Sequence, residues 1–354
     1  MSNIIALNAP PRRQRLSERT AALIECFARQ RRIPDDVFWL KENAELLNIL
    51  ECTGQQLTQD DLEPQRAFYE ELPERLGFFP QYYRFLLSIG LDLEDLGMEG
   101  VQMERLCTWT AAQGLPDAEL SDLQRAEARR LLARRGVHMG AADLGLDDRL
   151  RAFINRPETF ALPNKKAAYE LTHIVFYLSE YGRCDPKLGT AALTSLEYAG
   201  ILAYLDQNMD LLAEICVALR QAGRTPSAIW EGTVRANLST FYVVADDQTP
   251  FADHYHEYLV STWAMAVLGA DDSGAALPVG RCLFRRPENL ASALRPMSAA
   301  LMSFGASRSG DWGKMEQGVL GLLEEDAACT LQATVASSAV YPQFFEAFAR
   351  ATRL

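Results

Sequence analysis

One helical segment, residues 167–182, carries a histidine in the middle of an otherwise apolar run. Its apolar residues recur at the i, i+3, i+4 and i+7 spacing that predicts a helix with one buried face. His173 lies next to that face, and Glu170, Tyr177 and Tyr181 lie three, four and eight positions away from it, so they share one side of the helix. Imidazole is both a base near neutral pH and a metal ligand, so this group can transfer protons or bind a metal.

Two later apolar helices carry acidic or histidine side chains at positions that correspond along the helices. Counted back from the glycine that ends each helix, His173 and Glu214 are both nine residues away, and Asp210 and His256 are both thirteen residues away. We therefore expect these four side chains to converge between neighbouring helices, which is how helical interiors build metal and acid-base sites. Tyr177 joins them as a proton donor. For a divalent transition metal, the expected ligands are His173, His256 and Glu214. The alternative is a hydrogen-bonded polar network in a structural core.

The helices that carry these residues end at regular intervals. Gly182, Gly223 and Gly269 follow apolar helical runs and lie 41 and 46 residues apart, and each interval holds one further helical run, Leu188–Leu205 and Ala228–Val244. A unit of about 45 residues containing two helices must bury its apolar face against adjacent units. The sequence therefore predicts an all-α fold of stacked helix pairs, either a closed α/α toroid or an open stack. We expect the glycine-terminated helices to be inner neighbours and the more buried ones.

The first half of the chain shows the same helix pairs with more charge. A helix over Pro64–Leu72 is predicted to stop at Pro73. The acidic corner at residues 92–99 is predicted to be a solvated turn, and the arginine-rich helix at 121–136 a charged outer face. Residues 240–244 are β-branched and aromatic enough for a short strand. We expect a flexible tail over 1–14, an N-terminal helical part over 15–148 and a repeat part carrying the site over 149–354, the last two forming one domain.

Composition restricts the classes of function. The chain has 354 residues, 48% of them hydrophobic and 23% charged, and a formal net charge of −12. The negative charge opposes nucleic acid and anionic lipid as partners, because both are bound by concentrated positive charge. No apolar run approaches the roughly 20 residues that span a bilayer, so a cytoplasmic location is expected. The seven cysteines lack metal-site or disulfide spacing and are expected to be free thiols.

The segments THIVFY, DLLAE and YHEYLV, within residues 167–269, carry a resemblance to known proteins. They resemble bacterial helical proteins of unknown function in which T-H-x-x-F-Y, D-L-x-x-E and Y-H-x-x-L-V occur in this order. The resemblance implies an α/α-repeat fold and groups His173, Asp210, Glu214 and His256, but it implies no activity.

Two classes of function follow from these patterns. The first is an enzyme that acts on a small organic substrate in a central helical cavity by histidine and carboxylate acid-base or metal chemistry. The second is a non-catalytic binding or accessory protein that holds a peptide or protein partner, and a sensory module that binds without turnover is a variant of it. Both are compatible with a homo-oligomer. Converging carboxylates and imidazoles in a concave site would favour the enzyme.

Overall fold

The computed structural model describes residues 15–140, 143–246, 252–270, 277–287 and 291–351. The predicted all-α fold is confirmed, because 69% of the chain is helical, about twice the usual fraction, and the described residues contain a single two-stranded sheet. The predicted tail at 1–14 lies outside the described residues. No helix in the described part is long and apolar enough to cross a membrane.

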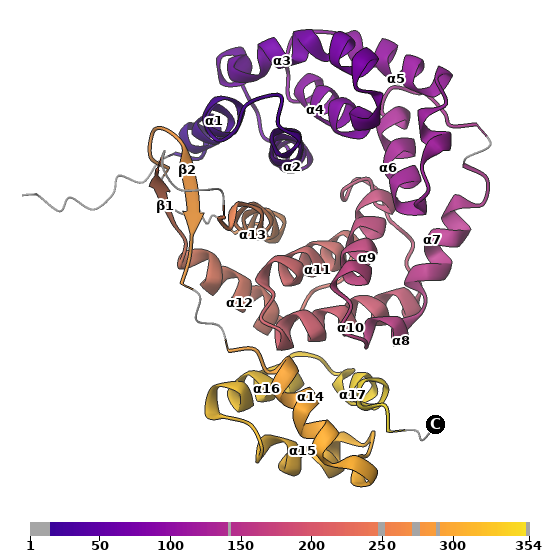
Figure 1. Ribbon diagram of the computed structural model, residues 1–354, viewed down its shortest axis with the longest axis vertical. Helices are drawn as coiled ribbons and strands as arrows, with labels where there is room; N and C mark the ends of the chain where they lie inside the picture. Colours follow the sequence, from indigo (N-terminus) through magenta and orange to yellow (C-terminus); the bar gives the residue numbers. More distant parts are fainter. Residues whose placement is uncertain (1–14, 141–142, 247–251, 271–276, 288–290, 352–354) are drawn as a thin grey trace, which may run out of the picture.

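Six of the described helices surround the centre of the molecule in Figure 1. Taken in chain order, each of these six helices contacts the next of the six, and the last contacts the first. These inner helices are α2 (Val37–Cys52), α4 (Tyr83–Asp95), α6 (Asp122–Ala133), α9 (Lys165–Leu178), α11 (Met209–Gln221) and α13 (Tyr255–Leu268). Along the chain, one or two outer helices separate consecutive inner helices.

A second set of helices lies outside these six in Figure 1. They are α1 (Leu16–Glu25) with the π-helical turn η1 (Cys26–Gln30), α3 (Gln59–Phe78), α5 (Gln102–Ala112), α7 (Leu146–Ile154), α8 (Pro157–Phe160), α10 (Thr190–Leu205) and α12 (Ala228–Ser239). Short 3₁₀ turns lie at η2 (Pro80–Tyr82) and η3 (Leu115–Ala118). The predicted glycine stops are confirmed for α11 and α13, where Gly223 and Gly269 have φ of 69° and 73°, a left-handed conformation that only glycine adopts without strain. The predicted stop is wrong for α9, which ends at Leu178, four residues before Gly182.

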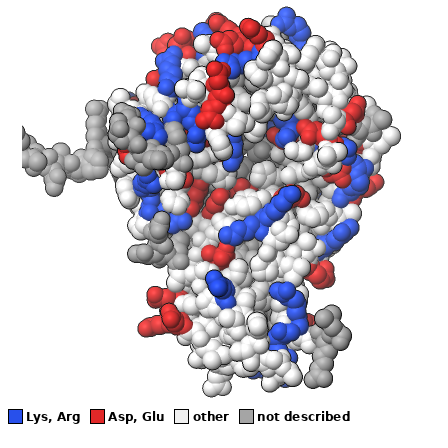
Figure 2. Space-filling view, in the orientation of Figure 1, with Lys and Arg blue, Asp and Glu red and all other residues white. Residues whose placement is uncertain are grey.

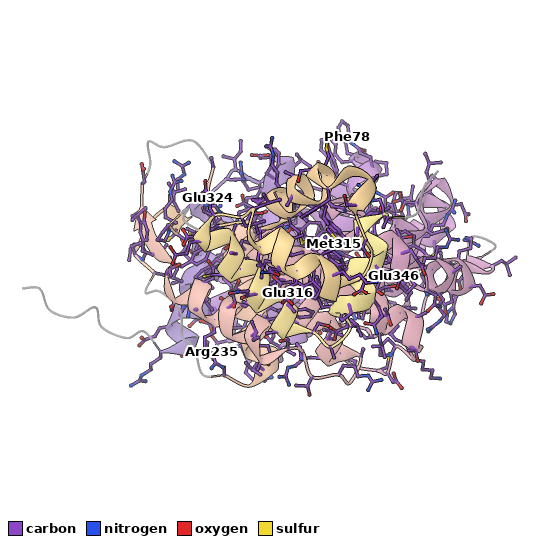
Figure 3. All side chains as sticks on the ribbon, turned by 90° about the horizontal axis from the view of Figure 1, so that it is seen from below. Phe78, Arg235, Met315, Glu316, Glu324 and Glu346 are labelled. Carbon is purple, nitrogen blue, oxygen red and sulfur yellow. The ribbon has the colours of Figure 1, made fainter. Side chains whose placement is uncertain are left out.

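The last helices form a layer beneath the others in Figure 1, and Figure 3 views the molecule from that end, with Met315 and Glu316 of α15 in front. They are α14 (Leu294–Ser303), η5 (Gly305–Ser307), α15 (Trp312–Leu320), α16 (Glu325–Ser337) and α17 (Tyr341–Ala349). Helices α16 and α17 pack on α10.

This C-terminal layer changes the burial of the outer helices. Helix α10 buries 11 of its 16 residues, whereas α9 buries 7 of 14, so the expectation that the glycine-terminated helices are always the more buried is wrong for α10. The reason is that α16 and α17 cover the side of α10 that faces away from α9 and α11. The expected neighbour relations hold, because α9 contacts α11 and α11 contacts α13. Their predicted core residues are buried, namely Leu171, Phe176, Leu212, Ile215, Leu259 and Trp263.

Helix α3 corrects one prediction. It runs from Gln59 to Phe78 through both Pro64 and Pro73, although Pro73 was expected to stop it. A proline leaves the carbonyl four residues earlier without its helical partner. Here that carbonyl belongs to Tyr69, and the side-chain amide of Gln102 donates a hydrogen bond to it. A neighbouring helix therefore supplies the bond that the proline removes.

The acidic corner at residues 92–99 and the arginine-rich segment at 121–136 form ion pairs with each other. They were predicted to be a solvated turn and a charged outer face, and neither prediction included these contacts. Arg134 lies 2.7 Å from Asp92 and 2.6 Å from Asp95, and Arg135 lies 2.9 Å from Glu94. Asp92 is fully buried. The acidic corner and the arginine-rich helix thus join α4 to α6 on one side of the molecule.

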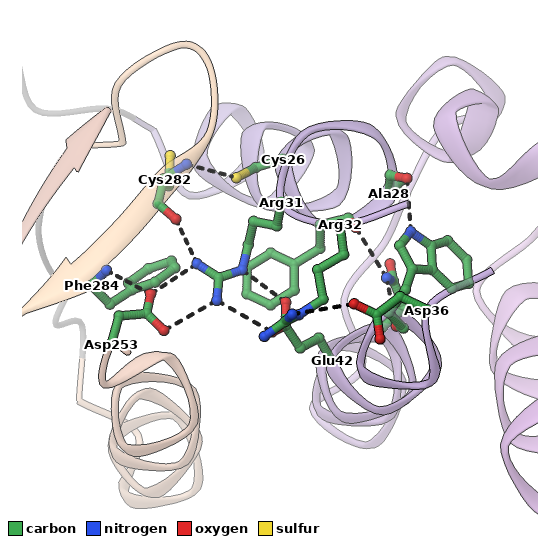
Figure 4. Close-up of polar contacts among 12 residues, drawn as sticks. Cys26, Ala28, Arg31, Arg32, Asp36, Glu42, Asp253, Cys282 and Phe284 are labelled. Carbon is green, nitrogen blue, oxygen red and sulfur yellow. Dashed lines mark hydrogen bonds and ion pairs between the residues drawn. The ribbon is translucent and has the colours of Figure 1, made fainter. Parts of the chain in front are cut away.

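The first and last inner helices meet at a seam that we define by Arg31, Glu42, Asp253 and Cys282 (Figure 4). The buried guanidinium of Arg31 lies 2.9 Å from Glu42 of α2 and 2.9 Å from Asp253, which precedes α13. It also donates to the carbonyl of Cys282 in strand β2. Strand β1 (Tyr242–Ala245) overlaps the predicted strand at residues 240–244 and pairs antiparallel with β2 (Cys282–Arg285).

Candidate functional site

A cavity of about 340 Å³ lies among the inner helices, and Figure 2 shows this face of the molecule hollowed near its centre, with charged side chains around the hollow. All six inner helices contribute to its lining. The lining side chains that can do chemistry are Lys41, Glu45, Arg84, Glu127, His173, Tyr177, Tyr181, Glu214 and His256. Every predicted site residue except Asp210 therefore faces the cavity, and Asp210 lies against His256.

The pair formed by His256 and Asp210 matches the predicted alignment of α11 with α13. Nδ1 of His256 is 2.9 Å from Oδ1 of Asp210. That oxygen is buried, yet no group in the described residues makes an aligned hydrogen bond to it. The other oxygen, Oδ2, accepts a hydrogen bond of 3.0 Å from the hydroxyl of Tyr169. The carboxylate is thus held in place on one side and has an unsatisfied oxygen next to the imidazole.

Glu214 and His173 form the second predicted pair. Glu214 is 2% exposed, and its Oε2 accepts a hydrogen bond of 2.5 Å from the hydroxyl of Thr172. Nδ1 of His173 is 3.7 Å from the same oxygen and 2.8 Å from the backbone carbonyl of Tyr169. A carbonyl can only accept, so Nδ1 carries the proton in the neutral ring and Nε2 is left to accept one.

Three of the four converging residues could hold a metal ion together. One ligand atom each from Asp210, Glu214 and His256 lies within 4.8 Å of the other two. His173 lies next to Glu214 but does not belong to this group of three. The geometry therefore favours Asp210 over His173 as the third member of a ligand set with His256 and Glu214.

Glu45 of α2 is a site residue that the sequence reasoning missed. Its Oε1 is 3.7 Å from Nε2 of His256, and its Oε2 is buried with no hydrogen bond from the described residues. Nζ of Lys41, one turn earlier in α2, lies 3.6 Å from Oε1 of Glu45. In the sequence these two residues therefore resemble a surface ion pair. A usable signal did exist: α2 also carries Glu42 and Asn43 among apolar residues on all sides, which is unusual for a helix with a solvated face.

The surroundings shift the pKa values of His256 and Glu214. Burial lowers the pKa of His256, but the hydrogen-bonding contact with Asp210 and the charges of Glu45, Asp210 and Glu214 outweigh it and raise the pKa to about 9. Burial raises the pKa of Glu214, and the charges of His173 and His256 oppose this effect. Around neutral pH the imidazolium of His256 thus balances part of the acidic charge.

Aromatic side chains from α9, α13 and the turn after α9 also line the cavity. The rings of Phe176 and Trp263 are 4.9 Å apart, and Tyr181 lies 5.8 Å from Phe176 and 5.9 Å from Trp263. Tyr177 places its ring 6.1 Å from that of His173, and burial raises the pKa of its phenol well above the usual value. Tyr177 therefore stays protonated and can act only as a donor at physiological pH.

The backbone that carries Tyr181 is strained. Glu180 and Tyr181 have φ of 49° and 53°, in the left-handed region that residues with side chains rarely adopt. The guanidinium of Arg130 stacks on Tyr181 with its carbon 4.3 Å from the ring centroid. Such strain persists only where the surroundings impose it and clusters at functional sites. Here it fixes the aromatic wall at the end of α9.

Comparison with curated proteins and with solved structures finds no match. A match to a protein family covers nearly all of the chain, from residue 1 to residue 351. The chain therefore belongs to the family described as Domain of unknown function (DUF6902).

Proposed function

We propose that this protein is a divalent-metal-dependent enzyme that acts on a small organic substrate in the central cavity of a closed α/α toroid. One observation carries the proposal: the imidazole of His256 and a buried, unsatisfied oxygen of Asp210 lie 2.9 Å apart without an aligned hydrogen bond. Two neighbouring ligands of one metal ion are about 3 Å apart when each bond is roughly 2.1 Å long. The contact thus fits two ligands of a shared ion.

The donor set fits a particular class of metal. Two carboxylates and one imidazole suit Mn²⁺, Fe²⁺ or Zn²⁺ better than Ca²⁺, which prefers oxygen ligands only, or Cu⁺, which prefers sulfur. Thr172 and Tyr169 bond to the outer oxygens of Glu214 and Asp210 and would orient them, as residues behind metal ligands do. A metal bound here would lower the pKa of a coordinated water and supply a nucleophile at neutral pH.

The remaining residues have roles that follow from their positions. His173 has Nε2 free to accept a proton, and Glu45 is a second base on the other side of His256. Tyr177 can donate a proton. The wall of Phe176, Tyr181 and Trp263 would hold the apolar face of a substrate, and the cavity volume of about 340 Å³ suits a small organic molecule.

The toroid belongs to the same proposal. Each inner helix contacts the next, and α13 contacts α2, which supports a closed ring over an open stack. In such a ring the cavity is bounded on all sides, and its residues come from segments far apart in the sequence. The cluster has this character, because Glu45 lies on the first inner helix and His256 on the last.

Metal binding tests the proposal directly. Protein purified without added metal and treated with a chelator would be titrated with Mn²⁺ and Zn²⁺ by calorimetry, and metal content would be measured after dialysis. We expect one ion per chain, and at least a tenfold loss of affinity in Glu214→Gln without loss of stability, since functional buried charges are often destabilising. Glu197→Gln is the matched control, because Glu197 of α10 is a partly buried glutamate bonded to Ser338, outside the cavity. Unchanged affinity in Glu214→Gln would refute the metal site.

A binding or accessory role for a peptide or protein partner is the second candidate. The observation that favours it is a group of exposed apolar side chains around the start of α2 and the end of α3. Ile33, which precedes α2, is 68% exposed, Phe38 in the first turn of α2 is 54% exposed, and Phe78 at the end of α3 is 76% exposed. Apolar groups of this kind often mark contact sites. If a second copy of the chain covers them, light scattering should show a dimer at high concentration that Phe78→Ser converts to a monomer. A monomer at all concentrations would remove this support.

A further inference from the structure

Two cysteines lie together at the seam, although they are 256 positions apart in the chain. Cys26 belongs to the π-helical turn η1 and Cys282 to strand β2, and both are almost fully buried. The backbone N–H of Cys282 donates to Sγ of Cys26 at 3.3 Å, as Figure 4 shows. We propose that Cys26 and Cys282 are a dithiol site that hydrogen peroxide oxidises reversibly to a disulfide across the seam.

The surroundings prepare Cys26 to react first. The hydrogen bond from the Cys282 thiol lowers the pKa of Cys26; burial opposes this, whereas the Cys282 N–H and the charge of Arg31 also lower it. The sulfur of Cys282 also lies 3.4 and 3.5 Å from the carbonyls of Pro278 and Gly280, and the contact with Cys26 and burial raise the pKa of Cys282, so its proton is retained. The more acidic thiol is the nucleophile, because the thiolate is the reactive form.

The local backbone is an independent sign of a special site. Residues Cys26–Gln30 form a π-helical turn in which the N–H of Arg31 bonds to the carbonyl of Cys26 at 2.9 Å. Such turns are rare and occur mostly at functional sites. This one places Arg31 and Cys26 on the same side, toward β2.

The reaction balances with hydrogen peroxide as the only oxidant. The Cys26 thiolate attacks one peroxide oxygen, which breaks the O–O bond, forms a sulfenic acid and releases hydroxide. The Cys282 sulfur then attacks the Cys26 sulfur, which forms the S–S bond, breaks the S–O bond and releases hydroxide, and the Cys282 proton converts this hydroxide to water. The proton that Cys26 had lost neutralises the first hydroxide. Two thiols and one peroxide thus give one disulfide and two waters. Burial of both sulfurs excludes bulky disulfides as oxidants.

The test is peroxide titration of the native protein followed by peptide mapping under non-reducing conditions. We expect a peptide that joins Cys26 to Cys282 and that dithiothreitol removes, and a higher urea midpoint in the oxidised protein, because the bond constrains a very long loop of the unfolded chain. Cys184 and Cys329 are exposed and serve as an internal measure of peroxide dose.

Variants separate the pair from the other thiols. Cys282→Ser should lose both the linked peptide and the increase in urea midpoint, whereas Cys107→Ser, which removes another buried free thiol, should behave as the wild type. Mapping of the wild-type protein requires no variant, so a variant that fails to fold leaves the test intact. Complete oxidation of Cys184 and Cys329 while Cys26 and Cys282 stay reduced would overturn the proposal.

Discussion

The raised pKa of His256 makes the stability of the metal-free protein depend on pH. The imidazole is protonated up to a pH of about 9 in the folded state but only up to about 6.5 in the unfolded state. The stabilising contribution is therefore complete below pH 6.5 and is lost as the pH rises through 9. The shift of about 2.5 units corresponds to about 3 kcal/mol. We expect the free energy of unfolding to fall by about this amount between pH 6 and pH 10.

Urea unfolding in the presence of a chelator, at pH 6, 7.5, 9 and 10, measures this dependence. His256→Gln is the control, because glutamine keeps a hydrogen-bonding side chain but does not titrate, and subtracting its curve removes the contributions of all other groups. Saturating Mn²⁺ should flatten the wild-type curve, since the metal displaces the same proton. Calorimetry in two buffers of different ionisation enthalpy should then detect about one proton released per ion at pH 7.5. Parallel curves for the wild type and His256→Gln would refute the ion pair with Asp210 as described.

Three further changes test other parts of the structure by urea unfolding or metal titration. Arg31→Met should cost about 3–5 kcal/mol, because the buried carboxylate of Asp253 loses Arg31 as its counterion and Glu42 keeps only Arg32, and a loss below 1 kcal/mol would contradict the seam. Gly200→Ala should cost about 1–3 kcal/mol, because the new methyl group would lie 2.5 Å from the fully buried ring of Trp230; unchanged stability would show that this packing is looser. Thr172→Val should weaken Mn²⁺ binding about tenfold, because Glu214 loses the hydroxyl that orients it. Affinity equal to the wild type would exclude that role.

The sequence predicted the parts of the structure that follow from periodicity. Helix spacing and terminal glycines were enough to align α9, α11 and α13, and this alignment placed His173 beside Glu214 and His256 beside Asp210. The reason is that residues counted from corresponding points of neighbouring helices lie at similar heights along the helix axes. The chemistry of the site, its metal and its substrate remain predictions.

The features that were missed depend on contacts between distant segments. Glu45 enters the site from the first inner helix, and its spacing from Lys41 is that of a surface ion pair; only the polar residues Glu42 and Asn43 beside it indicated a helix without a solvated face. Helix α3 continues past Pro73 because Gln102, on another helix, bonds to the freed carbonyl. Neither contact has a signature within one helix, so a reading of separate segments could not find them.

The position of the seam has a consequence for how the protein is made. Glu45 and Arg31 leave the ribosome early, whereas Asp253, His256 and Cys282 follow more than 200 residues later. Contacts so distant in sequence form late, because the intervening chain must first be ordered. Until then Arg31 has its contact with Glu42 but lacks those with Asp253 and the carbonyl of Cys282. During synthesis the seam can form only after Cys282 has been made, so chains truncated before Asp253 would retain much helix and yet lack every contact between Glu45 and His256.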